Sequence, residues 1–198
     1  MNGGDLNLTT RGQSVIAITS GFSTQECAMH ASNRLKVAGL TVRVFMIENH
    51  GLDFEKQLRT ETIAGVIDLT TSDLLPHRNN SDRLTSAGIL GIPQIISVGG
   101  LDFHEMDNRP TKPDELDIIG KEIVQKACAA RGPTRILLPL KGLSSRPQID
   151  ELNLFLFQSI RNWVYPPDML IEREQHINDP EFGTFAAEEL IKLMRLTS

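Results

Sequence analysis

Short apolar segments alternate with helical patterns along the chain. Six segments rich in β-branched residues have the length of buried strands: 14–19, 41–47, 65–69, 93–98, 134–138 and 168–172. Between them apolar residues recur at spacings of three and four, as at Ala28, Ala31 and Leu35, which is typical of a helix. This alternation predicts an α/β fold, a doubly wound parallel six-stranded sheet with helices on both faces, as in Rossmann-like proteins.

Glycine and proline mark the ends of the predicted helices. We expect helices at about 24–38, 54–61, 81–90, 113–131 and 148–165, and from 180 onward. Gly39 suits a left-handed cap, and Asp179-Pro180 suits a helix start. Six strands suggest the order 3-2-1-4-5-6, which places a ligand near the switch point between strands one and four.

Length and composition indicate one domain. The chain has 198 residues, 40% of them apolar, and a net charge of −5, which argues against non-specific nucleic-acid binding. We expect a mobile leader at 1–12 and a single domain at 13–198. No apolar run approaches the roughly 18 residues that cross a bilayer, and the first residues do not resemble a signal peptide, so we expect a cytoplasmic protein. Cys27 and Cys128 have no zinc-site spacing and are expected to be buried.

The loop after the first strand carries hydroxyl groups directly before a helix. Free backbone N–H groups and the helix dipole favour an anion there, although the same residues could simply cap the helix. The candidate ligand-binding residues in this loop are Thr19, Ser20, Gly21, Ser23 and Thr24.

The loops after the later strands add further polar residues at the same expected edge of the sheet. Asp68 either caps loop amides or contacts a ligand, and the two glycines after the fourth strand allow either a tight turn or a close ligand. His176 can transfer protons near neutral pH. The candidate catalytic residues are His176, Asp68 and Asp102, and the further binding candidates are Thr70, Thr71, Ser97, Gly99, Gly100, Lys141, Ser144, Asn178 and Asp179.

Several common motifs are absent from these loops. There is no G-x-G-x-x-G and no Walker lysine, so no dinucleotide or P-loop site is expected, and His50 is expected to be a solvated loop residue. Residues 21–25 partly resemble a nucleophile elbow, which would make Ser23, Asp102 and His176 a hydrolase triad. The acidic residues around His104 have no known metal-ligand spacing, and we expect no metal.

Several segments together resemble the tomato mosaic virus resistance protein-like ATP-binding family. The matching segments are Ile18-Thr19 with Ser23-Thr24, Gly65–Thr71, Asp82–Leu84, Gly91–Gln94, Gly99 with Leu101-Asp102, Leu137–Leu140 with Gly142 and Ser144, and His176–Pro180. The resemblance implies that residues 13–195 form the second of two α/β halves and that the ATP site lies in the first half. The chain departs from the family at the turn after the second strand, where only Gly51 remains of a glycine-rich loop. It departs again between Phe103 and Arg109, which is too short for the family's loop with a His-Asn pair.

The sequence therefore supports three functional hypotheses. The first is a small-molecule domain for an anionic, nucleotide-like or carboxylated ligand, as one half of a two-part enzyme. The second is a lyase or hydrolase that uses His176 with Asp68 or Asp102 as acid–base groups. The third is a non-catalytic subunit that completes a partner. The cofactor is unknown, and no nucleic acid or membrane is expected as a partner.

The fifth helix suggests self-association. Leu152, Phe155, Leu156 and Ile160 are expected to face the sheet. Leu154 and Phe157 would then lie on another side, where exposed apolar residues usually mark an interface. We expect a homodimer through this helix or a subunit that supplies the missing first half; the alternative is a helix covered by the leader or by a neighbouring helix.

Overall fold

A computed structural model describes residues 15–47, 51–75, 82–104, 109–146 and 150–197. The predicted leader at 1–12 and His50 lie outside the described residues.

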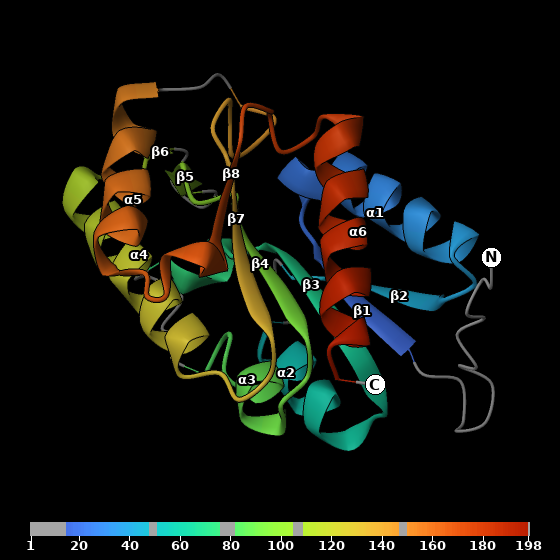
Figure 1. Ribbon diagram of the computed structural model, residues 1–198. Coiled ribbons are helices and arrows are strands. Elements are labelled where there is room, and N and C mark those ends of the chain that lie inside the picture. The colour runs from blue at the N-terminus through green and yellow to red at the C-terminus, as the bar shows by residue number, and fades with distance from the viewer. Residues whose placement is uncertain (1–14, 48–50, 76–81, 105–108, 147–149, 198) are drawn as a thin grey trace.

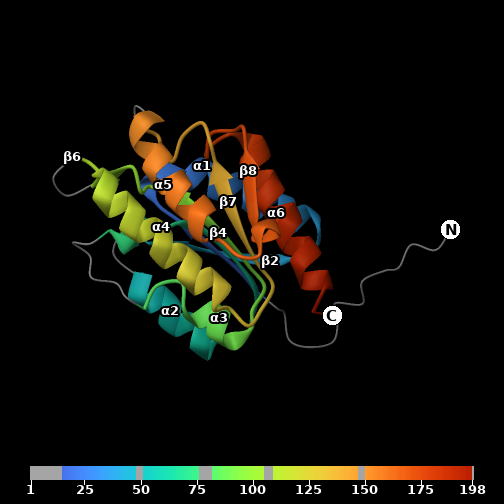
Figure 2. The same cartoon turned by 60° about the vertical axis from the view of Figure 1, so that its left-hand side comes forward.

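The predicted α/β architecture is confirmed. Six parallel strands form one sheet: β1 (Val15–Ser20), β2 (Thr41–Met46), β3 (Ile63–Thr70), β4 (Gln94–Gly99), β7 (Thr134–Pro139) and β8 (Leu170–Arg173). The helices are α1 (Gln25–Val37), α2 (Gly51–Thr60), α3 (Ser86–Leu90), α4 (Pro113–Cys128), α5 (Asp150–Trp163) and α6 (Pro180–Arg195). Helices α1 and α6 cover one face of the sheet, and α2 to α5 cover the other (Figures 1 and 2).

The predicted strand order is wrong. The observed order is β2-β1-β3-β4-β7-β8, so β3 lies beside β1 in the centre and β2 lies at the edge. Burial explains this choice, because almost every residue of β3 is buried whereas most of β2 is exposed. The switch point of the sheet consequently lies between β1 and β3 rather than between β1 and β4.

The glycine and proline positions in the sequence predicted most helix and strand ends to within a few residues. Gly39 has a φ of +81° after α1, as expected of a left-handed cap. Pro180 occupies the first turn of α6, but the Asp179 carboxylate accepts the backbone N–H of His176 instead of capping the helix. The short strands β5 (Phe103–His104) and β6 (Arg109–Pro110) pair antiparallel and are too short to show a sequence period.

The predicted orientation of the fifth helix is wrong for two aromatic residues. Phe155 is 46% exposed, whereas Phe157 is buried. The reason is that α5 packs against α4 as well as the sheet, and Ser159 contacts the position where Gly120 lacks a Cβ. The buried stripe of α5 is thereby rotated. Leu154 is 51% exposed, as expected.

Two further findings bear on the sequence analysis. Cys27 is buried as expected, but Cys128 is exposed. No helix among the described residues is long and apolar enough to cross a membrane.

Candidate functional site

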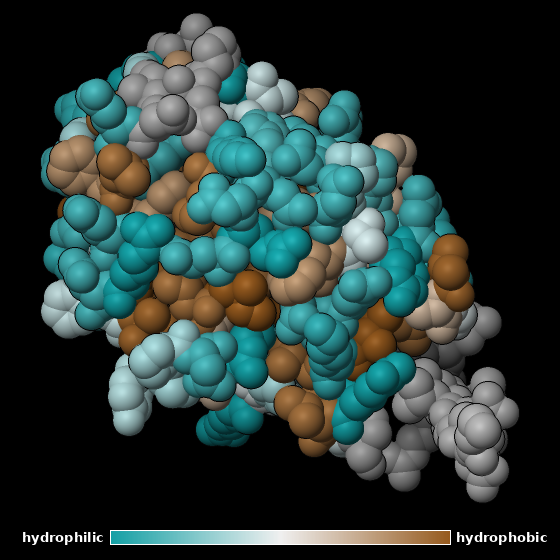
Figure 3. Space-filling model, turned by 45° about the horizontal axis from the view of Figure 1, so that its top comes forward, coloured by the Kyte–Doolittle hydropathy of each residue, from teal (hydrophilic) through white to brown (hydrophobic). Residues whose placement is uncertain are grey.

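The loops at the carboxyl ends of five strands are linked in a ring. Figure 3 turns this end of the molecule toward the viewer, where apolar groups lie between hydrophilic side chains. Five hydrogen bonds connect the loops in order: Thr24 Oγ1 with Thr70 Oγ1 (2.6 Å), Thr71 N–H to Gly99 O (3.1 Å), Gly100 N–H to Leu143 O (2.8 Å), Ile177 N–H to Gly142 O (2.9 Å) and Asn178 Nδ2 to Ser23 O (2.8 Å). The ring brings most of the candidate residues to one edge of the sheet, as the parallel topology requires.

The start of α1 is occupied by the protein itself. Asn178 accepts the N–H of Cys27 (3.4 Å) with its side-chain oxygen. The Gly21 N–H donates to Thr24 Oγ1 (2.9 Å), and the buried Ser20 accepts the Ile47 N–H (2.9 Å) with its backbone oxygen. Three of the N–H groups around this helix start, those of Gly21, Thr24 and Cys27, therefore already have partners within the chain.

The glycines after β4 are needed for packing. A Cβ on Gly99 would lie 2.3 Å from Leu69 O and 2.7 Å from both Thr24 Cγ2 and Ile177 Cδ1. Gly100 has a φ of +76°, which side chains rarely adopt. The two glycines bring the β4 loop against its neighbours, which is the tight-turn alternative of the sequence analysis.

Two candidate hydroxyls brace the strand ends. Thr71 Oγ1 donates to Ser97 O (3.2 Å), and Ser97 Oγ donates to Leu137 O (3.0 Å). These bonds tie β3, β4 and β7 together. The Lys141 side chain lies on the exposed surface at the end of β7.

Asp68 lies two residues before Thr70 on β3 and belongs to a buried ion cluster. Its carboxylate accepts two bonds from the guanidinium of Arg83 (2.7 and 2.8 Å) and one from Thr19 Oγ1 (2.7 Å). Arg83 also donates to Asp73 (2.6 Å), to Glu55 (3.2 Å) and to the backbone oxygen of Thr70 (3.1 Å). All five N–H groups of Arg83 are thus bonded, and the side chain has no exposed surface. Sequence reasoning missed this cluster because a single arginine in a polar loop carries no periodic signal.

The charges of this cluster shift its pKa values. Burial alone would lower the pKa of Arg83, but the Asp68 and Asp73 carboxylates raise it well above its usual value. Burial raises the pKa of Asp73, against the opposing effect of Arg83. The cluster joins α2, β3 and the turn before α3, so its evident effect is on the fold.

A second polar group at the strand ends contains Asp102, Ser144 and His176. Ser144 Oγ donates to Asp102 Oδ2 (2.7 Å), while Asp102 Oδ1 is buried and has no hydrogen-bond partner among the described residues. Burial raises the pKa of Asp102, although the bond from Ser144 and the nearby charge of Arg146 lower it in part.

His176 is held by backbone groups on both sides of its ring. Its Nε2 lies 2.9 Å from Ser144 O, and its Nδ1 accepts the Asn178 N–H (3.1 Å), so the proton is assigned to Nε2. Asp102, Ser144 and His176 come from three different loops and lie together. The proposed triad partner Ser23 instead binds Asn178 through its backbone oxygen.

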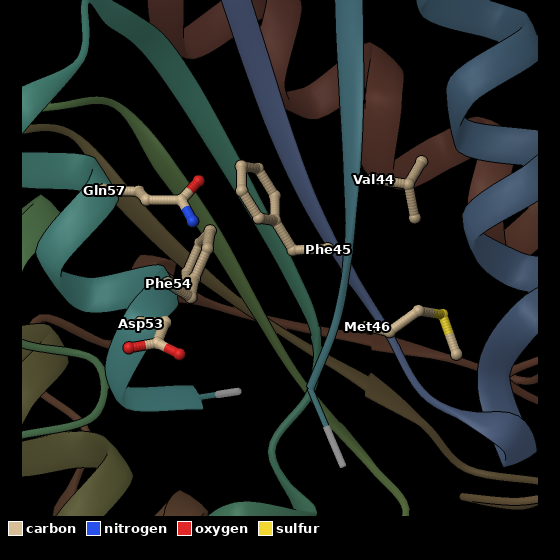
Figure 4. A pocket seen from close by; sticks show the side chains of 6 residues that line it. All are labelled: Val44, Phe45, Met46, Asp53, Phe54 and Gln57. Atoms are coloured by element: carbon tan, nitrogen blue, oxygen red, sulfur yellow. The ribbon is translucent and has the colours of Figure 1, made fainter. Parts of the chain in front are cut away.

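A pocket lies away from the Asp102 group, at the edge of the sheet formed by β2. A hollow of about 260 Å³ lies beside β2 and α2 and is lined by Val44, Phe45, Met46, Asp53, Phe54 and Gln57 (Figure 4). Among the described residues no group of three or more His, Cys, Asp or Glu side chains is placed to hold a metal ion.

Comparison with known proteins identifies the family. The model of the uncharacterised protein family UPF0261 C-terminal domain matches residues 13–117 and 110–194. A UPF0261 protein of Clostridium tetani is 27% identical over 200 residues, covering 83% of this chain and 50% of the relative. A second, from Rhizobium meliloti, is 27% identical over 218 residues, covering 89% and 54%. The chain thus spans about half the length of these curated relatives.

A solved structure is more distantly similar. It is a LacI-family putative transcriptional regulator from Rhizobium etli, which is 9% identical and covers 93% of this chain and 92% of its own, with a TM-score of 0.40. At that score the similarity supports no functional inference.

These matches correct the resemblance drawn from the sequence. The tomato mosaic virus resistance protein-like ATP-binding family was the wrong assignment, because the family model and both curated relatives point to UPF0261. The chain belongs to the UPF0261 family, whose C-terminal domain it matches over almost its whole length.

Proposed function

We propose that this chain is a binding domain for a small carboxylated metabolite, with its site around Asp102 at the carboxyl ends of β4, β7 and β8. The observation that carries the proposal is the Asp102 side chain. One of its oxygens is bonded to Ser144 and the other is buried without a partner among the described residues. A buried polar atom without a partner costs free energy, and a ligand that supplies the missing bond would recover it.

The raised pKa of Asp102 fits this role. Burial raises the pKa of Asp102, which lowers the cost of a ligand carboxylate beside it, and the unpartnered oxygen can accept a bond from a ligand hydroxyl. Arg146 is close enough to influence the pKa of Asp102, and Lys141 follows β7 in the same loop. These two cations would balance a ligand's negative charge.

A carboxylated ligand is favoured over a nucleotide. A nucleotide needs free backbone N–H groups for its phosphates, and at the start of α1 the N–H groups of Gly21 and Cys27 are bonded to Thr24 and Asn178. A carboxylate needs only one or two donors, a role that we assign to the Lys141 and Arg146 side chains. Of the anionic ligands that the sequence suggested, we therefore propose a carboxylated metabolite rather than a nucleotide.

Binding is favoured over catalysis for this chain by itself. Both ring nitrogens of His176 are engaged with backbone groups, so an acid–base role would require the ring to turn. The curated relatives are about twice as long, which supports a two-part protein in which another domain closes the site. The lyase or hydrolase alternative and the cytoplasmic location remain predictions.

The proposal is tested by thermal unfolding with a panel of hydroxycarboxylic acids, dicarboxylic acids and nucleotides. A ligand at about 100 times its Kd stabilises the folded state by about 2.7 kcal/mol, which raises the Tm of a domain of this size by about 5–10 °C. We expect such a rise with a carboxylic acid and not with a nucleotide.

Two variants locate the site. Asp102→Asn should abolish the ligand-induced rise. Asp168→Asn removes an exposed carboxylate distant in sequence and should leave the rise unchanged. If no acid in the panel shifts Tm, or if Asp102→Asn responds as the wild type does, the proposed function is wrong.

A further inference from the structure

The outer edge of β2 is open to pairing. The Ile47 N–H donates to Ser20 O of β1, so the odd-numbered residues of this strand point their backbone groups into the sheet. Val42, Val44 and Met46 therefore point their N–H and C=O groups outward. Edge strands are usually protected by bulges, prolines or charged side chains, yet β2 pairs with β1 over six consecutive residues without a bulge or proline and carries one charge, Arg43.

Two neighbouring side chains on one face of this edge strand are apolar and exposed. Val44 is 45% exposed and Met46 is 39% exposed, on the side of the strand opposite to Phe45 (Figure 4). On the α2 side, Phe45 packs on Phe54 with ring centroids 5.1 Å apart. The 260 Å³ hollow lies at this edge, where a neighbouring strand would bring its own side chains.

We propose that β2 pairs antiparallel with β2 of a second copy of this chain, about a two-fold axis at Val44. In this register Val44 lies opposite its own copy, and Val42 lies opposite the partner's Met46. All three outward-pointing residues then form hydrogen-bonded pairs, giving about six backbone bonds. The two sheets join into one, through a surface that is self-complementary as a two-fold interface requires.

Charge complementarity favours a second copy as the occupant. The same register places Arg43 of one copy opposite Phe45 of the other, beside the hollow that Asp53, Phe54 and Gln57 line. Within its own chain Arg43 pairs with Glu61 and lies 5.7 Å from the ring centroid of Phe45, so the aromatic face suits a guanidinium, while Asp53 pairs with the exposed Lys56. Asp53 supplies a carboxylate at the same hollow, and the arrangement occurs twice by symmetry.

Sedimentation velocity and chemical cross-linking test the proposal. The wild-type chain should sediment as a dimer at micromolar concentration. Val44→Lys should raise the dimer dissociation constant at least about tenfold, because two lysines would then lie directly opposite each other. The matched control is Leu154→Lys, which makes the same change at a 51% exposed residue of α5 and should leave the dimer intact.

Cross-linking fixes the register and does not depend on the stability of the lysine variant. In a Cys128→Ser background, Val44→Cys should give a covalent dimer with a short bismaleimide. Val37→Cys, at an 83% exposed residue of α1, should not. A monomeric wild type, a dimer unaffected by Val44→Lys, or loss of the dimer in Leu154→Lys would each overturn the β2 interface; the last would place the contact on α5.

Discussion

Replacing Arg83 with methionine is expected to destabilise the fold strongly. Methionine keeps much of the length of the side chain but removes the charge and all five hydrogen bonds that Arg83 donates. Asp68, Asp73 and Glu55 would then remain buried without their shared cation.

The magnitude follows from the burial of the cluster. Removing one partner of a buried ion pair costs about 3–5 kcal/mol, because the remaining charge is left uncompensated. In a domain of this size each kcal/mol lowers Tm by about 2–4 °C, so Tm should fall by about 6–20 °C. The difference in unfolding free energy between the wild type and Arg83→Met should be largest near pH 7 and should shrink toward pH 4. Without the cation the folded-state pKa values of the carboxyls rise, and protonation then removes the buried charge.

The measurement is urea unfolding at pH 7 and pH 4, followed by circular dichroism. Arg34→Met is the matched control, since it breaks an ion pair with Glu188 whose side chains are 33% and 42% exposed and should cost less than about 1 kcal/mol. Arg83→Lys keeps the charge without the forked geometry and should fall between the two. The stabilising role of Arg83 would be refuted if Arg83→Met and Arg34→Met lost equal unfolding free energy. It would also be refuted if the loss in Arg83→Met grew toward pH 4.

Two further predictions concern packing and pH. Gly99→Ala should lower the free energy of unfolding, measured in urea, by about 1–3 kcal/mol, because its Cβ would meet three neighbours. Gly39→Ala has nothing within 4 Å of its Cβ and should lose about 1 kcal/mol from its backbone angle alone. Equal losses in the two variants would contradict the close approach of the loop after β4. The bond from Arg109 lowers the pKa of Glu115 to about 2, so its stabilising contribution is present above about pH 4.5 and is lost as the pH falls toward 2. Glu115→Gln should therefore lower Tm at pH 7 and have little effect near pH 2, and a pH-independent difference would count against the Arg109 pair.

The sequence predicted part of the candidate site. A parallel sheet requires the loops after its strands to meet at one edge, so the proximity of Thr24, Thr70, Gly99 and Asn178 followed from topology. The hydrogen-bond partners of these residues could not be predicted from the topology. Asn178 lies 151 residues from Cys27, whose N–H it accepts, and no local pattern encodes a contact over that separation.

Asp68 illustrates the same limit. Its place near the end of an apolar strand suggested a ligand contact, but neighbouring residues of a strand point to opposite faces, and Asp68 lies on the face covered by α2. Arg83 fills the position beside it. The sequence shows both residues, and only the packed structure brings the two charges together.

The sequence by itself determined the elements and the fold class. The spacing of apolar residues that marks a strand or a helix is a local property of the chain, so it can be recognised without the tertiary structure. This spacing predicted a six-stranded parallel sheet with helices on both faces. Tertiary structure decided the strand order, the rotation of α5, and which polar groups pair. These depend on the total burial of elements distant in sequence: the buried β3 occupies the centre and the exposed β2 the edge, a comparison that can be made only once the strands are assembled.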